Sequence, residues 1–116
     1  MTRASTVAAA KLAEAAPVFA ALGDDTRLHI VARLCGDGPL SIVQIADTAA
    51  VSRQAVTKHL RALQRAGLVR SDRAGRERIW ELQPGKLAAV RDYLDAISAQ
   101  WDQALRRMQA LVEEPQ

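Results

Sequence analysis

Long hydrogen-bond donors crowd one side of the segment VSRQAVTKHLRALQRAGLV, which spans residues 51–69. The donors are Arg53, Gln54, Thr57, Lys58 and Arg61, and no acidic residue occurs from position 52 to position 66. Guanidinium, ammonium and amide groups hydrogen-bond to phosphate oxygens and to the base edges of nucleic acids. A helix face that met only solvent would normally carry both signs of charge. The pattern therefore indicates a surface that contacts a polyanion.

The positive charge of the chain is concentrated around this segment. The 116 residues include 16 Lys or Arg and 13 Asp or Glu, a net charge of +3. Residues 52–78 hold eight of the basic residues and two of the acidic ones, so this part carries +6 and the remainder carries −3. Charge localised in this way is typical of a site where nucleic acid binds.

Two short helices are predicted to position these donors. Ser41 followed by Gln44 has the spacing of a capping box, which predicts a helix through about Ala49. Ser52 caps a second helix, over about residues 52–66, and Gly67 follows where a left-handed residue would end it. The second helix also has apolar residues at helical spacing, namely Val56, Leu60 and Leu63, followed by Leu68. Two helices with so short a connection predict a helix-turn-helix, whose second helix enters the DNA major groove.

A β-hairpin is predicted directly after the second helix. The stretches LVRSD and RIWEL flank the turn Arg73-Ala74-Gly75-Arg76, and Gly75 permits a tight reversal. Arg73, Arg76 and Arg78 lie at and just after this turn, which suits a wing (about residues 70–82) that holds the DNA backbone or a narrow minor groove. The predicted fold is mainly α with a small β-hairpin, a winged helix-turn-helix.

The chain ends in a long predicted helix. No helix breaker occurs between Pro84 and Pro115, and apolar residues recur in alternating steps of three and four. A helix of about 28 residues spans ~42 Å. This is longer than a domain of 116 residues needs, so we expect part of the helix to contact a second copy of the chain. The predicted dimer interface comprises Val90, Leu94, Ile97, Trp101, Leu105 and Met108. The predicted organisation is an N-terminal extension, helical or flexible (1–16), a DNA-binding core (17–83) and a dimerisation helix (84–116).

These segments together resemble the ArsR/SmtB winged-helix repressors. The resemblance rests on ALGDDTRLHIVARL, then PLSIVQIADTAAVSRQAVTKHLRALQRAGLV, then RAGRERIWEL, and it spans roughly residues 18–111. It implies a dimeric DNA-binding repressor with the terminal helices at the dimer interface. It also implies that Ser52, Arg53, Gln54, Thr57 and Lys58 occupy the DNA-reading positions, and that Arg73, Arg76 and Arg78 occupy the wing.

The chain departs from the metal-sensing members of that family. Where they have a Cys-x-Cys, this sequence has Ser41 and Val43, and no His follows His59 to form a site on the final helix. Transition metals prefer several thiolate or imidazole ligands. We therefore predict no metal site and no cofactor, as in the branch of the family that lacks the metal sites. The one cysteine, Cys35, is predicted to be a small packing residue, buried or half-buried.

The predicted function is a dimeric transcriptional repressor on a pseudo-palindromic operator of double-stranded DNA. Arg53, Gln54 and Thr57 would contact bases, while Lys58, Arg61 and the wing arginines would contact phosphates; His59 would pack or hydrogen-bond a phosphate. The alternative is a winged-helix module that binds protein without specific DNA binding. No pattern indicates an enzyme or an inducer pocket. We expect a soluble cytoplasmic protein, since no apolar run approaches the ~20 residues of a membrane span.

Overall fold

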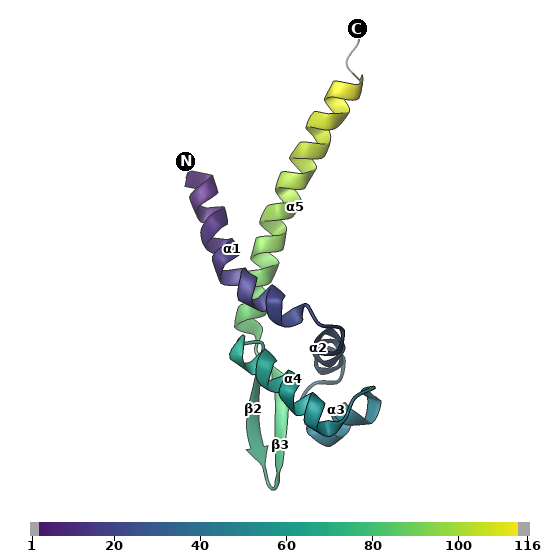
Figure 1. The fold of residues 1–116 in the computed structure, drawn as a ribbon. Helices are drawn as coiled ribbons and strands as arrows, with labels where there is room; N and C mark the ends of the chain where they lie inside the picture. The colour runs from purple at the N-terminus through teal and green to yellow at the C-terminus, as the bar shows by residue number, and fades with distance from the viewer. Residues whose placement is uncertain (1–2, 114–116) are drawn as a thin grey trace.

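The computed structural model describes residues 3–113, with side chains from residue 9 onward. Residues 1–2 of the predicted extension and residues 114–116 of the predicted final helix lie outside this part. The described chain forms five helices and three strands. In order these are α1 (Arg3–Leu22), α2 (Asp25–Asp37), β1 (Leu40–Ser41), α3 (Ile42–Thr48), α4 (Arg53–Arg65), β2 (Val69–Ala74), β3 (Glu77–Leu82) and α5 (Pro84–Glu113). The molecule is elongated, 71 × 29 × 20 Å, because the upper part of α5 extends beyond the other elements (Figure 1).

Every helix and strand contributes to one hydrophobic core. Its members lie at helical or strand spacing and are at most 8% exposed, and they include Val18, Ile30, Leu34, Leu40, Ile45, Val56, Leu60, Leu63, Leu68, Val69, Trp80 and Val90. Burying one side chain of this size contributes about 1.5–3 kcal/mol relative to leaving it in water. Three of these residues come from α4, so the core fixes which side of α4 faces outward.

The two predicted helices of the helix-turn-helix are confirmed as α3 and α4. Ser41 Oγ accepts a hydrogen bond from Gln44 N at 3.2 Å, and Gln44 Oε1 accepts one from Ser41 N at 2.9 Å, which completes the predicted capping box. Ser52 Oγ accepts from Ala55 N at 3.2 Å at the start of α4. These caps satisfy backbone N–H groups that would otherwise lack partners, and they set the short connection between the helices.

A left-handed glycine ends α4. Gly67 has φ of 79° and donates its N–H to Gln64 O, while Leu68 N donates to Leu63 O at 3.0 Å. This pair of hydrogen bonds is a Schellman motif, which favours glycine at the left-handed position. The chain then enters β2 with Leu68 and Val69 buried, so the helix end and the strand start are tied to the same core.

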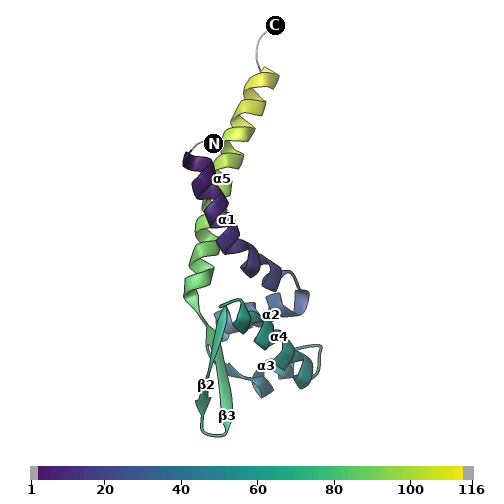
Figure 2. The same cartoon turned by 60° about the vertical axis from the view of Figure 1, so that its left-hand side comes forward.

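The predicted hairpin is confirmed, but it belongs to a three-stranded sheet of order β1-β3-β2. Strands β2 and β3 pair antiparallel from Val69↔Leu82 to Ala74↔Glu77, so the turn is only Gly75-Arg76 and Gly75 takes φ of 66°. Strand β1 was not predicted; it pairs with β3 at Leu40↔Trp80. In Figures 1 and 2 the hairpin points away from the end where α1 and α5 rise.

The N-terminal part of the chain differs from the prediction. We expected an extension over residues 1–16 that ends before the DNA-binding core, whereas α1 is one helix from Arg3 to Leu22 with Pro17 inside it. A proline in a helix interior removes one backbone hydrogen bond. Packing offsets this cost, because Ala15 and Val18 are buried and the Phe19 ring meets the ring of Tyr93 on α5 edge-on at 5.9 Å. The predicted boundary at residue 16 therefore falls within a helix.

The prediction for Cys35 is wrong. Its side chain is exposed on α2, because the buried stripe of that helix is formed by Ile30 and Leu34 and position 35 turns outward. Within residues 3–113, no helix has the length and apolar character needed to cross a membrane.

Candidate nucleic-acid interface

Helix α4 separates its side chains cleanly into an inner and an outer face. Val56, Leu60 and Leu63 are fully buried. The face directly opposite, at steps of four, three and four, consists of Gln54, Lys58, Arg61 and Arg65, all exposed. We call these four residues the outer face of α4. It has no acidic member, so it presents an array of hydrogen-bond donors held by a helix whose other side is anchored in the core.

The remaining predicted reading residues flank the outer face near the start of α4. Arg53 is exposed, and Thr57 is half-buried with its Oγ1 donating to Arg53 O at 2.9 Å. Ser52 Oγ is used in the helix cap. The N-terminal turns of α4 thus bring Arg53, Gln54 and Thr57 together at the exposed end of the helix, while Lys58 and Arg61 follow along it.

The three wing arginines are exposed at the end of the hairpin. Arg73 lies directly across from Arg78 in the strand register, and Arg78 Nη1 donates to Ser71 Oγ at 2.9 Å. Like charges opposite one another on a sheet are destabilising, and a bound anion would relieve their repulsion. Arg70 differs from these three because it forms an ion pair with Glu81.

Arg27 connects α2 to α4, a contact that the sequence did not predict. Its Nε donates to His59 Nδ1 at 3.2 Å, and its Nη1 donates to Ala21 O at 3.4 Å. Asp24 Oδ2 lies 3.7 Å from the same His59 nitrogen. Asp24 is the N-cap residue of α2, but its side chain makes no capping hydrogen bond. His59 is half-buried on the flank of α4, where it contacts side chains at the start of α2.

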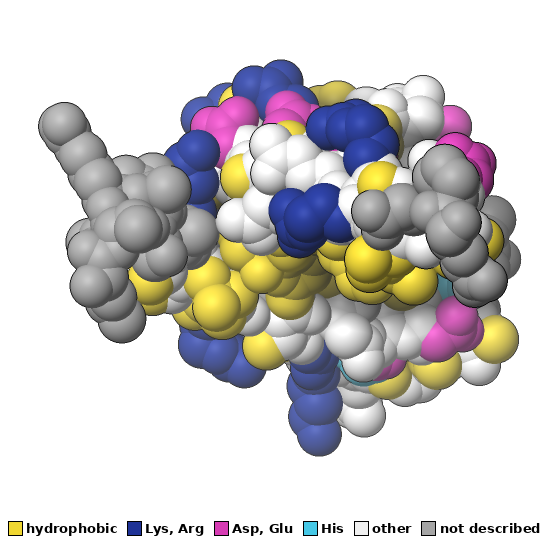
Figure 3. Space-filling model, turned by 90° about the horizontal axis from the view of Figure 1, so that it is seen from above, with side chains coloured by type: hydrophobic (Ala, Val, Ile, Leu, Met, Phe, Trp, Pro, Cys, Tyr) yellow, Lys and Arg dark blue, Asp and Glu magenta, His cyan; other side chains and the backbone are white. Residues whose placement is uncertain are grey.

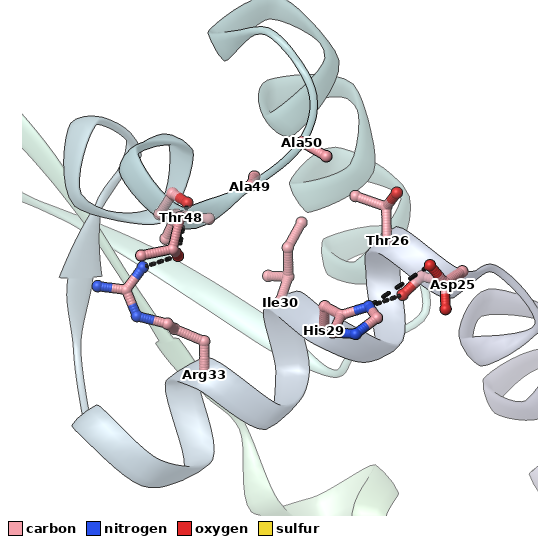
Figure 4. Close-up of a pocket in the computed structure, with 9 residues that line it drawn as sticks. Asp25, Thr26, His29, Ile30, Arg33, Thr48, Ala49 and Ala50 are labelled. Carbon is pink, nitrogen blue, oxygen red and sulfur yellow. Dashed lines mark hydrogen bonds and ion pairs between the residues drawn. The ribbon is translucent and has the colours of Figure 1, made fainter.

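Arg33 connects α2 to α3 in a similar way (Figure 4). Its Nη1 donates to Thr48 Oγ1, which Figure 4 shows. The same Nη1 donates to Gln44 O at 2.7 Å, and Nε donates to Asp37 Oδ2 at 2.7 Å. A hollow of about 400 Å³ lies beside this arginine, and its lining includes Ile30 and Ala50. Arg33 closes one side of the hollow and holds α3, which in turn braces α4.

The upper part of α5 presents a second surface. Four of the predicted interface residues are large and exposed: Leu94 (48%), Trp101 (64%), Leu105 (50%) and Met108 (61%). Leu111 continues the row at 75% exposed. Figure 3, viewed from above, shows hydrophobic side chains gathered in a band across this end of the molecule. Monomeric proteins rarely expose so many adjacent apolar side chains.

The other two predicted interface residues are less accessible. Val90 is only 7% exposed and belongs to the core of its own chain, so it has almost no surface to offer a partner. Ile97 is half-buried in a groove between α1 and α5 that Leu12 and Tyr93 also line. Val90 is therefore unsuited to the predicted dimer interface, and Ile97 offers it only part of its surface.

Among residues 3–113, no three side chains of His, Cys, Asp or Glu come together to hold a metal ion. That the protein has no metal site remains a prediction.

A helix-turn-helix followed by a hairpin, with a basic second helix, defines the winged helix-turn-helix class. A helix-turn-helix domain family matches residues 22–72. The HTH-type transcriptional regulator Rv2034 of Mycobacterium tuberculosis (strain ATCC 25618 / H37Rv) is 42% identical over 93 residues, which cover 80% of this chain and 83% of that protein.

Solved structures place the chain within the class. The ArsR-like transcriptional regulator from Rhodococcus sp. RHA1 is 41% identical, with a TM-score of 0.72 over 89% of this chain and 96% of that one. The homodimeric winged helix-turn-helix DNA-binding domain Mb0332 from Mycobacterium bovis is 28% identical, with a TM-score of 0.61 over 79% of this chain and 83% of that one. This chain belongs to the ArsR family of winged helix-turn-helix transcriptional regulators. The predicted fold class and family are confirmed.

Proposed function

We propose that the chain is a cytoplasmic homodimeric repressor that binds a pseudo-palindromic DNA operator. The observation that carries the proposal is the outer face of α4, whose exposed donors have no acidic neighbour on the helix and whose orientation is fixed by the core. A major groove ~12 Å wide admits one helix and presents acceptor groups on its base edges. A regulator of this kind acts by occupying DNA, and its residues perform no catalysis.

Within that complex the residues divide by role. Arg53, Gln54 and Thr57 lie in the N-terminal turns of α4, the part of a recognition helix that reaches base edges, and they would select the sequence. Lys58 and Arg61 would contact phosphates beside the groove. The wing arginines at positions 73, 76 and 78 would contact the backbone at a second place. Phosphate contacts set affinity and register, whereas base contacts set specificity.

The dimer would form through the upper part of α5. Its exposed apolar row is an uncovered surface of the kind that obligate dimers bury, and the relative Mb0332 is described as homodimeric. A two-fold dimer presents two copies of α4, and spacing them by one turn of DNA, ~34–36 Å, would let both read major grooves on the same side of the duplex. Pairing through α5 leaves both outer faces free.

Selection of bound fragments from genomic DNA, followed by anisotropy titrations, tests the proposal. We expect enrichment of a short motif and its inverted copy, bound at least ~10³-fold more tightly than random duplex. Equal affinity for all duplexes, or none at all, would contradict specific operator binding and favour the protein-interaction module. Reporter expression from a promoter that contains the motif then separates repression from activation.

A further inference from the structure

A basic hollow lies between the first turn of α2 and one flank of α4. It has a volume of about 400 Å³ and is lined by Arg27, Ala55, Lys58, His59, Arg61, Ala62 and Arg65. Four of these seven side chains are cationic. The two alanines are on the flank of α4 and are only half-buried, so small side chains leave open space between the charged groups. The hollow thus combines room for a small group with a strong excess of positive charge.

The cations of the basic hollow lack the ion pairs that other arginines of the chain have. Within residues 3–113, none of the four has a carboxylate oxygen within 4 Å, whereas Arg33 pairs with Asp37 and Arg70 with Glu81. Asp24 is an acidic group near the hollow, and its Oδ2 lies 3.7 Å from His59 Nδ1. Cations gathered without a matching anion repel one another, and an anion bound among them would remove that repulsion.

Arg27 is held in an orientation suited to binding such an anion. Its hydrogen bonds to His59 Nδ1 and to Ala21 O use two of its five N–H donors and fix the guanidinium against α1 and α4. The remaining donors stay free to form charge-assisted hydrogen bonds. A side chain that is already ordered loses less conformational entropy on binding than a free surface arginine does.

The position of the basic hollow identifies the anion. It lies beside the outer face of α4, and Lys58, Arg61 and Arg65 belong to both. When a recognition helix occupies the major groove, the phosphates that border the groove lie against the flanks of that helix. We propose that the basic hollow binds one backbone phosphate of the DNA in each half-site, with Arg27 and Arg65 as direct contacts. This proposal rests on the proposed DNA-binding function and adds a residue of α2 to the interface.

Salt dependence of DNA binding tests the proposal in the full-length protein. Arg27→Ala and Arg65→Ala should each lower the slope of log K against log salt by about one unit per protomer. Raising the salt from 50 to 200 mM should therefore lower the affinity of each variant less than that of the wild type. The two factors of decrease should differ by about 3.5-fold per protomer. The selected motif should be unchanged, since a phosphate carries no sequence information. Arg91→Ala is the matched control, because Arg91 is an exposed arginine on α5, outside the hollow.

Two further measurements separate phosphate binding from a structural role of Arg27. Arg27→Lys keeps the charge but not the guanidinium geometry, and we expect it to retain the wild-type salt slope. Replacing single phosphates of the operator by neutral methylphosphonates should find one position per half-site at which the loss of affinity is smaller for Arg27→Ala than for the wild type. A coupling of this kind requires that the side chain and the phosphate interact.

The outcomes separate this inference from the proposed function. If the wild type binds the operator and both alanine variants keep its affinity and salt slope, the basic hollow binds no phosphate. A changed selected motif in Arg27→Ala would also overturn the inference, because it would mean that Arg27 acts by orienting α4. If the wild type binds no duplex at all, the proposed function itself fails.

Discussion

Replacing Trp101 by alanine should weaken dimerisation more than any other single truncation on α5. Trp101 is 64% exposed within the chain. A tryptophan buries roughly 200 Å² when fully covered, so a partner can remove about 130 Å² of its surface from water. At about 25 cal/mol per Å² this contributes about 3 kcal/mol. A two-fold interface contains the residue twice, so the upper estimate is about 6 kcal/mol, or about 10⁴-fold in the dimer dissociation constant.

Sedimentation equilibrium over a range of protein concentrations measures this constant directly. Leu28→Ala is the matched control, because Leu28 is 51% exposed but lies on α2, away from α5. We expect the control to dimerise like the wild type and Trp101→Ala to be monomeric at micromolar concentration. Circular dichroism should show that both variants are folded, since neither residue belongs to the core. If Trp101→Ala retains the wild-type dimer dissociation constant, the exposed row on α5 is not the dimer interface. The assumption that a partner chain covers Trp101 is then refuted.

Two further predictions concern DNA reading and the end of α4. Arg53→Ala should weaken operator binding by ~1–3 kcal/mol and relax the preference at one base position, whereas Arg76→Ala should weaken binding to all sequences alike. Fragment selection with each variant measures both effects. If Arg53→Ala and the wild type select identical motifs, the assignment of Arg53 is contradicted. Gly67→Ala should lower the free energy of unfolding by ~1–2 kcal/mol in urea titrations, because Gly67 has φ of 79° and an added Cβ would lie 3.0 Å from the Lys86 side chain. Gly85→Ala, whose added Cβ meets nothing within 4 Å, should be neutral or slightly stabilising, and equal losses in the two variants would refute the role of the left-handed position.

The features that the sequence predicted well are those that depend on neighbouring residues. The capping box of Ser41 and Gln44, the cap at Ser52 and the left-handed Gly67 are each set within about five residues, and all three are present in the structure. The hairpin also follows from local signals, with Gly75 at the turn. The two faces of α4 follow from helical periodicity alone.

The features that the sequence did not predict depend on distant partners. Strand β1 has two residues and exists because Leu40 pairs with Trp80, forty positions away. The helix around Pro17 continues because α5 packs against it. The bond from Arg27 to His59 crosses 32 positions, and neither residue belongs to a local pattern that would reveal it. Val90 fits the apolar row of α5, but only the packed fold shows that its own core covers it.

Footprinting of guanine N7 on the selected operator tests the central claim most directly. Dimethyl sulfate methylates this atom in the major groove, so a helix inserted there protects it. If the outer face of α4 reads DNA as a two-fold dimer, the bound operator should show two protected regions centred ~10–10.5 base pairs apart, in inverted sequence. Unprotected N7 atoms throughout a bound operator that contains guanines in both half-sites would contradict the account.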